Sequence, residues 1–136
     1  MAANTAPIFP LTPKATWTKL TAANTLTDGT GTVPVIFTAG ADGGRLDKIR
    51  CRALGTNVAT VVRVFLNNGS TAATATNNSL IAEKFLPATT AANAAEIGPN
   101  IDIEINLAIP ATYTVMVCIG TAVSAGWQFT ALGGNY

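Results

Sequence analysis

Histidine is absent from this chain of 136 residues, and charged residues make up only 11% of it. Without histidine the chain lacks the commonest general base and a frequent metal ligand. No apolar run approaches the roughly 18 residues that a membrane-spanning helix needs. These absences argue against an enzyme, a metal or cofactor protein and a membrane protein, and they favour a structural or binding role.

Cysteine is also scarce, with two residues, Cys51 and Cys118, far apart in the sequence. They form no zinc signature and are too few for the disulfide framework of a small secreted protein. Both lie inside strand-like patterns as small apolar residues. We therefore favour free, buried thiols over a disulfide.

The net charge is +1, so no overall field attracts the chain to nucleic acid or to an anionic membrane. Residues 1–7 lack the basic start and the apolar run of a signal peptide, so we expect the protein to be made and kept in a cytoplasm. Much of the 49% hydrophobic content is alanine mixed with threonine. Such a neutral surface can pack closely against other subunits, and it favours a protein that works as part of an assembly.

Apolar and polar residues alternate without a break from Ile101 to Leu107. This is the period of a β-strand with one dry and one wet face. Similar alternation between turn signals predicts about eight strands. We expect them at residues 16–20, 33–38, 45–54, 58–67, 79–86, 101–107, 112–119 and 126–131. Residues 88–95 have no strand period and are predicted to form a loop.

Each alternating strand has one face to bury, so the chain is predicted to form an all-β, two-sheet antiparallel sandwich. The strand count suits a jelly roll or a related Greek key. An immunoglobulin-like sandwich is an alternative, although the Cys–Trp–Cys framework of antibody domains is missing. The strands at 45–54 and 58–67 are the best hairpin candidate, and Pro34 places its strand end at an edge or a start.

Pro7, Pro10 and Pro13 recur at every third position near the N-terminus. Proline restrains both itself and its predecessor to extended backbone. We therefore expect residues 1–14 to form an extended arm and residues 15–136 to form a single sandwich domain. A disordered tail is the alternative, but the apolar pair at 8–9 would be poorly placed in water and favours an arm.

Acidic residues offer little sign of catalysis or calcium binding. Asp102 and Glu104 share a strand face, as a glycosidase pair would require, but that strand's other face is uniformly aliphatic. A solvated or interface surface is therefore favoured over a catalytic pair. Asp28 and Asp42 each stand alone, without the cluster of oxygen ligands that calcium needs.

Alternation places Lys48, Arg50 and Arg52 on one strand face. Two interpretations are equally open: pairing across strands with acids such as Asp102 and Glu104, or a basic stripe that meets an acidic partner surface. Nucleic acid is disfavoured because aromatic residues do not interleave with these cations.

Tryptophan occurs twice, near opposite ends of the chain. Such residues cap a core or anchor an interface, and exposed ones would form the sugar platform of a lectin-like sandwich. The candidate protein-interface residues are Ile8, Phe9, Trp17, Lys48, Arg50, Arg52, Trp127 and Tyr136.

A histidine-free sandwich rich in alanine, threonine and glycine, with a proline-marked arm, resembles the capsid cement (decoration) proteins of tailed bacteriophages. Local runs at residues 28–31, 37–44, 63–68 and 126–136 also resemble small phage virion proteins. The resemblance implies a protein of the capsid exterior, made in the host cytoplasm, that bridges major capsid subunits. It further implies a homodimer or homotrimer without a cofactor. A tail or fibre module that recognises a host glycan and a stand-alone soluble sandwich are the alternatives.

Overall fold

The computed structural model describes residues 9–90 and 98–136. Within these residues the chain forms eight strands and one short 3₁₀ helix. The strands are β1 (Thr12–Leu20), β2 (Val35–Thr38), β3 (Gly44–Ala53), β4 (Thr60–Asn67), β5 (Asn78–Leu86), β6 (Ile101–Ile109), β7 (Thr114–Ile119) and β8 (Trp127–Asn135), and the helix η1 is Ala75–Asn77. In the described ranges, no helix has the length and apolar character needed to cross a membrane.

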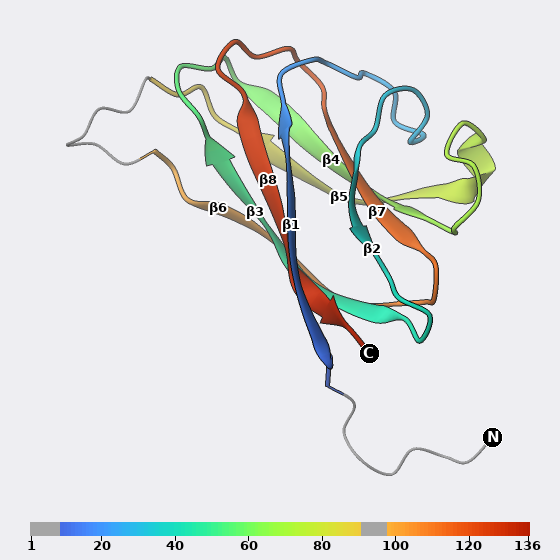
Figure 1. Cartoon of the computed structure of the whole chain (residues 1–136). Coiled ribbons are helices and arrows are strands. Elements are labelled where there is room, and N and C mark those ends of the chain that lie inside the picture. The colour runs from blue at the N-terminus through green and yellow to red at the C-terminus, as the bar shows by residue number, and fades with distance from the viewer. Residues whose placement is uncertain (1–8, 91–97) are drawn as a thin grey trace.

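The eight strands form two four-stranded antiparallel sheets that pack face to face (Figure 1). The first sheet has the order β1-β8-β3-β6, and the second sheet has the order β2-β7-β4-β5. Every connection except the one between β4 and β5 passes from one sheet to the other, which is the winding of a jelly roll. The predicted all-β sandwich is confirmed, and its strand order is that of the jelly roll.

The strands predicted to form a hairpin, β3 and β4, lie in different sheets, so that prediction is wrong. β3 pairs with β6 and β8, whereas β4 pairs with β5 and β7. Buried Asn57 holds the link between them across the end of the sandwich. Its Nδ2 donates to the Gly126 carbonyl at 3.0 Å, and its Oδ1 accepts from the backbone N–H groups of Ala125 and Gly126. A short polar link therefore serves here as a crossing between sheets.

The main core lies between the two sheets and takes alternate side chains from each strand. In the first sheet β8 lies between β1 and β3, and it directs Trp127 and Phe129 inwards, where both are fully buried. The prediction of Trp127 as an interface residue is therefore wrong. A residue on the inner face of a central strand is covered by the opposite sheet and has no surface to offer.

β1 and β2 are edge strands of the two sheets. β2 begins at Val35, directly after Pro34, as the proline predicts. β1 begins at Thr12, so the last three residues of the predicted arm belong to the first sheet. Ile8 and the other residues of 1–8 lie outside the described residues, as do residues 91–97, which hold most of the loop predicted at 88–95.

Two loops, residues 21–34 and 68–77, cover part of the outer face of the second sheet. Beneath them Phe65, Met116 and Cys118 form a second, smaller core. The loop residues that pack against it are Val33 and Ala72. On the first sheet, by contrast, every outward-facing side chain of the described residues is at least partly exposed.

Candidate functional site

Cysteine and acidic side chains do not assemble into a reactive centre in the described part of the chain. No group of three or more of them lies close enough together there to hold a metal ion. Cys51 and Cys118 are free and buried. Burial raises the pKa of the Cys51 thiol to about 12 and also raises the pKa of the Cys118 thiol. Both thiols are therefore protonated near neutral pH and are not activated as nucleophiles.

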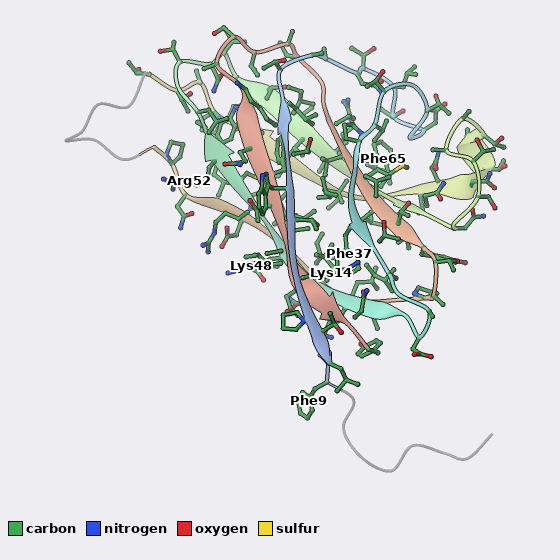
Figure 2. The ribbon with its side chains drawn as sticks, viewed as in Figure 1. Phe9, Lys14, Phe37, Lys48, Arg52 and Phe65 are labelled. Atoms are coloured by element: carbon green, nitrogen blue, oxygen red, sulfur yellow. The ribbon has the colours of Figure 1, made fainter. Side chains whose placement is uncertain are left out.

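The outer face of the first sheet gathers four of the eight predicted interface residues, and we call it the charged face. Strand register arranges its side chains in rows that run across β1, β8, β3 and β6. The central row is Trp17, Thr130, Arg50 and Asp102. The flanking rows are Lys19, Gln128 and Arg52 on one side and Ala15, Leu132, Lys48 and Glu104 on the other. Figure 2 shows Lys48 and Arg52 along β3 on this face, away from Phe37 in the interior.

Asp102 holds an ion cluster on the β6 side of the charged face. Arg50 donates to both of its carboxylate oxygens, at 3.0 and 3.1 Å, and the Lys48 ammonium lies 3.1 Å from Oδ2. The hydrogen bond from Arg50 is the main reason that the pKa of Asp102 falls to about 2. Pairing across strands, one of the two interpretations of this stripe, is therefore confirmed for Lys48 and Arg50. Lys48 stands opposite Glu104 in register yet contacts the acid of the neighbouring row.

The β1 side of the same face carries positive charge without a local acid. Arg52 and Lys19 lie on either side of Gln128 in one row, and neither makes an ion pair or a hydrogen bond within the described residues. Trp17, in the next row, keeps 64% of its surface exposed. This part of the face therefore combines two unpaired cations with an exposed aromatic ring.

Lys19 and Gln128 were not among the residues predicted from the sequence. Alternation along β1 places Lys19 on the same face as Trp17, and that signal is visible in the sequence alone. Its position beside Arg52 is not visible, because β1 reaches β3 only through β8. The cluster therefore depends on the order of strands that are distant in the chain.

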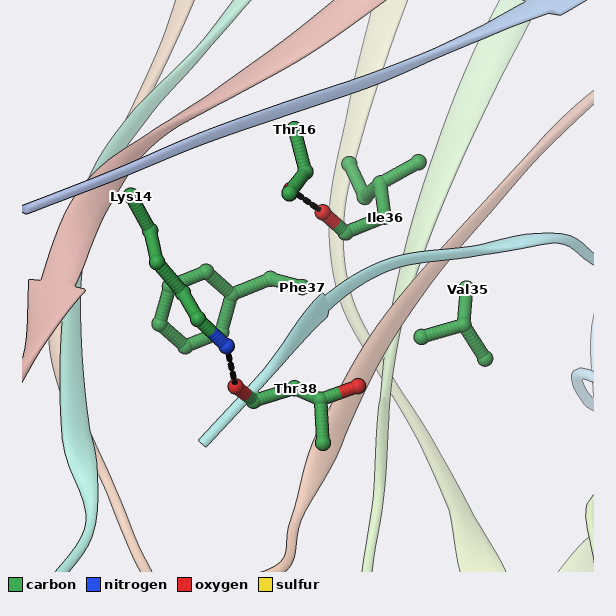
Figure 3. A pocket seen from close by; sticks show the side chains of 6 residues that line it. All are labelled: Lys14, Thr16, Val35, Ile36, Phe37 and Thr38. Atoms are coloured by element: carbon green, nitrogen blue, oxygen red, sulfur yellow. Dashed lines mark hydrogen bonds between the residues drawn. The ribbon is translucent and has the colours of Figure 1, made fainter. Parts of the chain in front are cut away.

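A shallow pocket lies between the two edge strands β1 and β2 (Figure 3). The Lys14 ammonium donates to the Thr38 carbonyl at 2.7 Å and lies 5.5 Å from the centroid of the Phe37 ring. The Thr16 hydroxyl donates to the Ile36 carbonyl. Side chains of β1 thus satisfy backbone acceptors on the free edge of β2, so these polar groups of the pocket are already engaged.

Large apolar side chains are exposed along and beside these edge strands, which together we call the β1–β2 edge. Phe9 and Leu11 precede or enter β1 and are 71% and 83% exposed, and Val35 on β2 is 51% exposed. Phe9 stands away from the sandwich in Figure 2. Tyr136, another predicted interface residue, follows β8, is partly exposed and donates its N–H to the Gly43 carbonyl at 3.3 Å. Phe9, Trp17 and Tyr136 are thus available to solvent, unlike Trp127.

The charged face and the β1–β2 edge are two surfaces of the described residues that can serve as sites. Neither encloses a deep cavity, so both suit extended partners better than small molecules. Comparisons with family models, with curated proteins and with solved structures found no match to this chain.

Proposed function

We propose that this chain is a structural virion protein that acts as capsid cement. In this role it binds the outer surface of a phage head and bridges major capsid subunits. The observation that carries the proposal is the β1–β2 edge, where large apolar side chains stay in water although the sandwich core is complete. Large apolar side chains that stay exposed along one edge of a folded domain suit an interaction site.

The fold and the composition support the same proposal. Jelly rolls occur in viral capsid proteins as well as in lectin domains, so this support is an analogy of architecture. The low charge of the chain suits a subunit packed among neighbours. The described residues also lack a cluster that could hold a metal, and the two thiols are buried. A structural protein needs neither a metal site nor a reactive thiol.

Self-association through the β1–β2 edge is part of the proposal. β1 is a nine-residue edge strand, and a free edge is a template for pairing with another chain. A homodimer or homotrimer would present several copies of each contact, so that weak individual contacts would give firm attachment to a repetitive shell. The protein would be made in the host cytoplasm and would end on the capsid exterior.

Quantitative mass spectrometry of purified particles from the source that encodes this chain tests the proposal. We expect a copy number comparable to that of the major capsid protein. A few copies per particle would instead assign the protein to the tail or a fibre. Absence from the particles would refute a virion role.

A pair of matched variants then tests the edge itself on heads that lack the wild-type chain. Leu11→Ser with Val35→Ser removes two exposed apolar side chains of the β1–β2 edge. We expect this change to lower occupancy about tenfold. Leu54→Ser with Val58→Ser removes an exposed leucine and an exposed valine elsewhere and should leave occupancy unchanged. Equal losses in both pairs would contradict attachment through the edge.

A tail or fibre module that recognises a host glycan is the second candidate function. Trp17 favours it, because a large indole ring stays 64% exposed on a flat sheet surface, as a sugar platform requires. Trp127 adds nothing to this platform, since it is buried. The platform therefore has one aromatic ring, and the neighbouring polar side chains decide what it can hold.

A further inference from the structure

Unpaired positive charge is concentrated on one part of the charged face. The chain has eight lysine and arginine residues, and most of them have a partner in the described residues. Those with a partner are Lys14, Arg45, Lys48, Arg50 and Arg63. Of the cations without one in these ranges, Lys19 and Arg52 share a single row, while Lys84 lies on β5 in the other sheet. Two of the three thus point out from one small area.

The spacing within this area follows from sheet geometry. Neighbouring strands lie about 4.8 Å apart, so the Cα atoms of Lys19 and Arg52, two strands apart, are about 10 Å from each other. Trp17 precedes Lys19 by two residues on the same face, a separation of about 7 Å. Gln128 lies between the two cations and Thr130 beside Trp17. The result is a flat surface in which an aromatic ring, two cations and two hydrogen-bonding side chains are all within reach of one extended ligand.

No acidic side chain of the described residues lies in the row of Lys19, Gln128 and Arg52. Asp102 lies on β6, at the far side of the face, and its carboxylate is already engaged by Arg50 and Lys48. A ligand carboxylate that approaches Lys19 and Arg52 therefore meets no free acid in its own row. A shallow hollow lined by Ala15, Thr16 and Trp17 lies beside the aromatic ring on β1, the edge strand of the sheet.

We infer that this surface binds a carboxylate-bearing polysaccharide, with Trp17, Lys19, Arg52, Gln128 and Thr130 as its contacts. The apolar face of a sugar ring packs on the indole of Trp17, and the guanidinium of Arg52 and the ammonium of Lys19 bind sugar carboxylates through charge-assisted hydrogen bonds. Gln128 and Thr130 supply donors and acceptors for hydroxyl groups. A neutral glycan would leave both cations unused, and a purely acidic peptide such as polyglutamate would offer no ring to pack on the indole.

This inference deepens the second candidate function and rests on it for the ligand being a glycan. It is independent of the cement proposal, because it concerns the isolated chain rather than its place in a particle. Copy number on particles and sugar binding by the purified protein can therefore succeed or fail separately.

Titration of the full chain with oligogalacturonate tests the inference. Fluorescence is a direct readout because the chain has two tryptophans: Trp17 is exposed and Trp127 is buried. We expect saturable binding with a change in the exposed tryptophan's emission, and weaker binding as salt is raised. Calorimetry gives the same affinity without a chromophore. A neutral malto-oligosaccharide of equal length should not bind measurably.

Single substitutions then locate the site. Lys19→Gln, Arg52→Gln and Trp17→Ala should each weaken oligogalacturonate binding about tenfold. Lys84→Gln removes another unpaired lysine with the same change in net charge and should leave binding unchanged. Emission from buried Trp127 shows that each variant is folded.

Several results would overturn the inference. The first is absence of oligogalacturonate binding. The second is equal binding of the malto-oligosaccharide, which would make the site a neutral-sugar platform. The third is binding of polyglutamate as tightly as oligogalacturonate, which would assign the surface to acidic proteins. Equal losses in Lys84→Gln and Lys19→Gln would reduce the effect to overall charge.

Discussion

The two outer faces of the sandwich differ in what covers them. Phe65 on β4 and Trp17 on β1 are both aromatic residues that point away from the main core, yet Phe65 is fully buried and Trp17 is 64% exposed. Loops 21–34 and 68–77 account for the difference, because they close over the part of the second sheet that holds Phe65. Phe85 on β5, on the same outer face, is not covered in this way and is 66% exposed. An outward-pointing side chain thus becomes core or surface according to the loops above it.

Asparagine side chains hold the covering loops in place. The Asn24 amide donates to the carbonyls of Thr30 and Thr32, at 2.8 and 3.2 Å, and its Oδ1 accepts from the Leu26 N–H. Asn78 then joins the two loops, because its Nδ2 donates to the carbonyl oxygens of residues 28 and 72. These bonds replace a strand ladder for backbone that has no sheet partner. The charged face has no such covering loop in the described residues, and most of its outward-facing side chains are polar.

The comparison predicts a large difference between two aromatic truncations. Phe65→Ala should lower the free energy of unfolding by about 3–5 kcal/mol, because it leaves a cavity beneath the loops. Trp17→Ala, its counterpart on the charged face, should change it by less than about 0.5 kcal/mol. Urea denaturation of both variants measures the difference. Similar losses would mean that Trp17 is covered by another part of the chain.

A smaller effect is expected when one loop anchor is removed. Asn24→Ala should lower the free energy of unfolding by about 1–3 kcal/mol, because backbone groups of its loop lose their partners. The loop also shields Cys118, whose Sγ contacts the Asn24 carbonyl. We therefore expect faster reaction of Cys118 with a thiol reagent in this variant, followed by mass spectrometry. Cys51 in the main core is the internal control, and equal acceleration at both thiols would indicate global unfolding rather than loop opening.

The smallest effect concerns the ion cluster that Asp102 forms on the charged face. The pKa of Asp102 is lowered to about 2 in the folded protein, below its value in an unfolded chain, so ionised Asp102 stabilises the fold above about pH 4. This contribution is lost as the pH falls towards 2. Asp102→Asn should lower the free energy of unfolding near neutral pH by less than about 1 kcal/mol, and the difference should vanish at low pH.

Denaturation of wild type and Asp102→Asn across this pH range measures the effect. Glu104→Gln removes another carboxylate of β6, one that has no ion pair in the described residues, and serves as the matched control. A difference between wild type and Asp102→Asn that persists unchanged at pH 2 would show that the carboxylate's charge is not the cause.

The sequence predicted the strands better than their partners. Alternation identifies which side chains share a face, and it located all eight strands and the stripe from Lys48 to Arg52. It missed the first four residues of β1 and the last four residues of β8. It does not state which strand lies alongside, and so the link at 55–57 was interpreted as a hairpin although it crosses between sheets. Trp17 and Trp127 occur in similar alternating runs, but one lies on the outer face of an edge strand and the other on the inner face of a central strand. Burial at these positions depends on strand order, which is a non-local property.

The position of β8 in the first sheet has a consequence for folding. β8 comes last along the chain, yet it lies between β1 and β3 and is the strand through which they join. During synthesis, therefore, β4 and β5 are the one consecutive pair among these eight strands that can form a local hairpin. β3 can pair with β6 before the chain is complete, but β1 has no partner until β8 is made. Folds dominated by such distant pairings form slowly, and their waiting strands are open to wrong partners. Pro13, Lys14 and Lys19 on β1 are residues of the kind that protect an unpaired strand from aggregation during that interval.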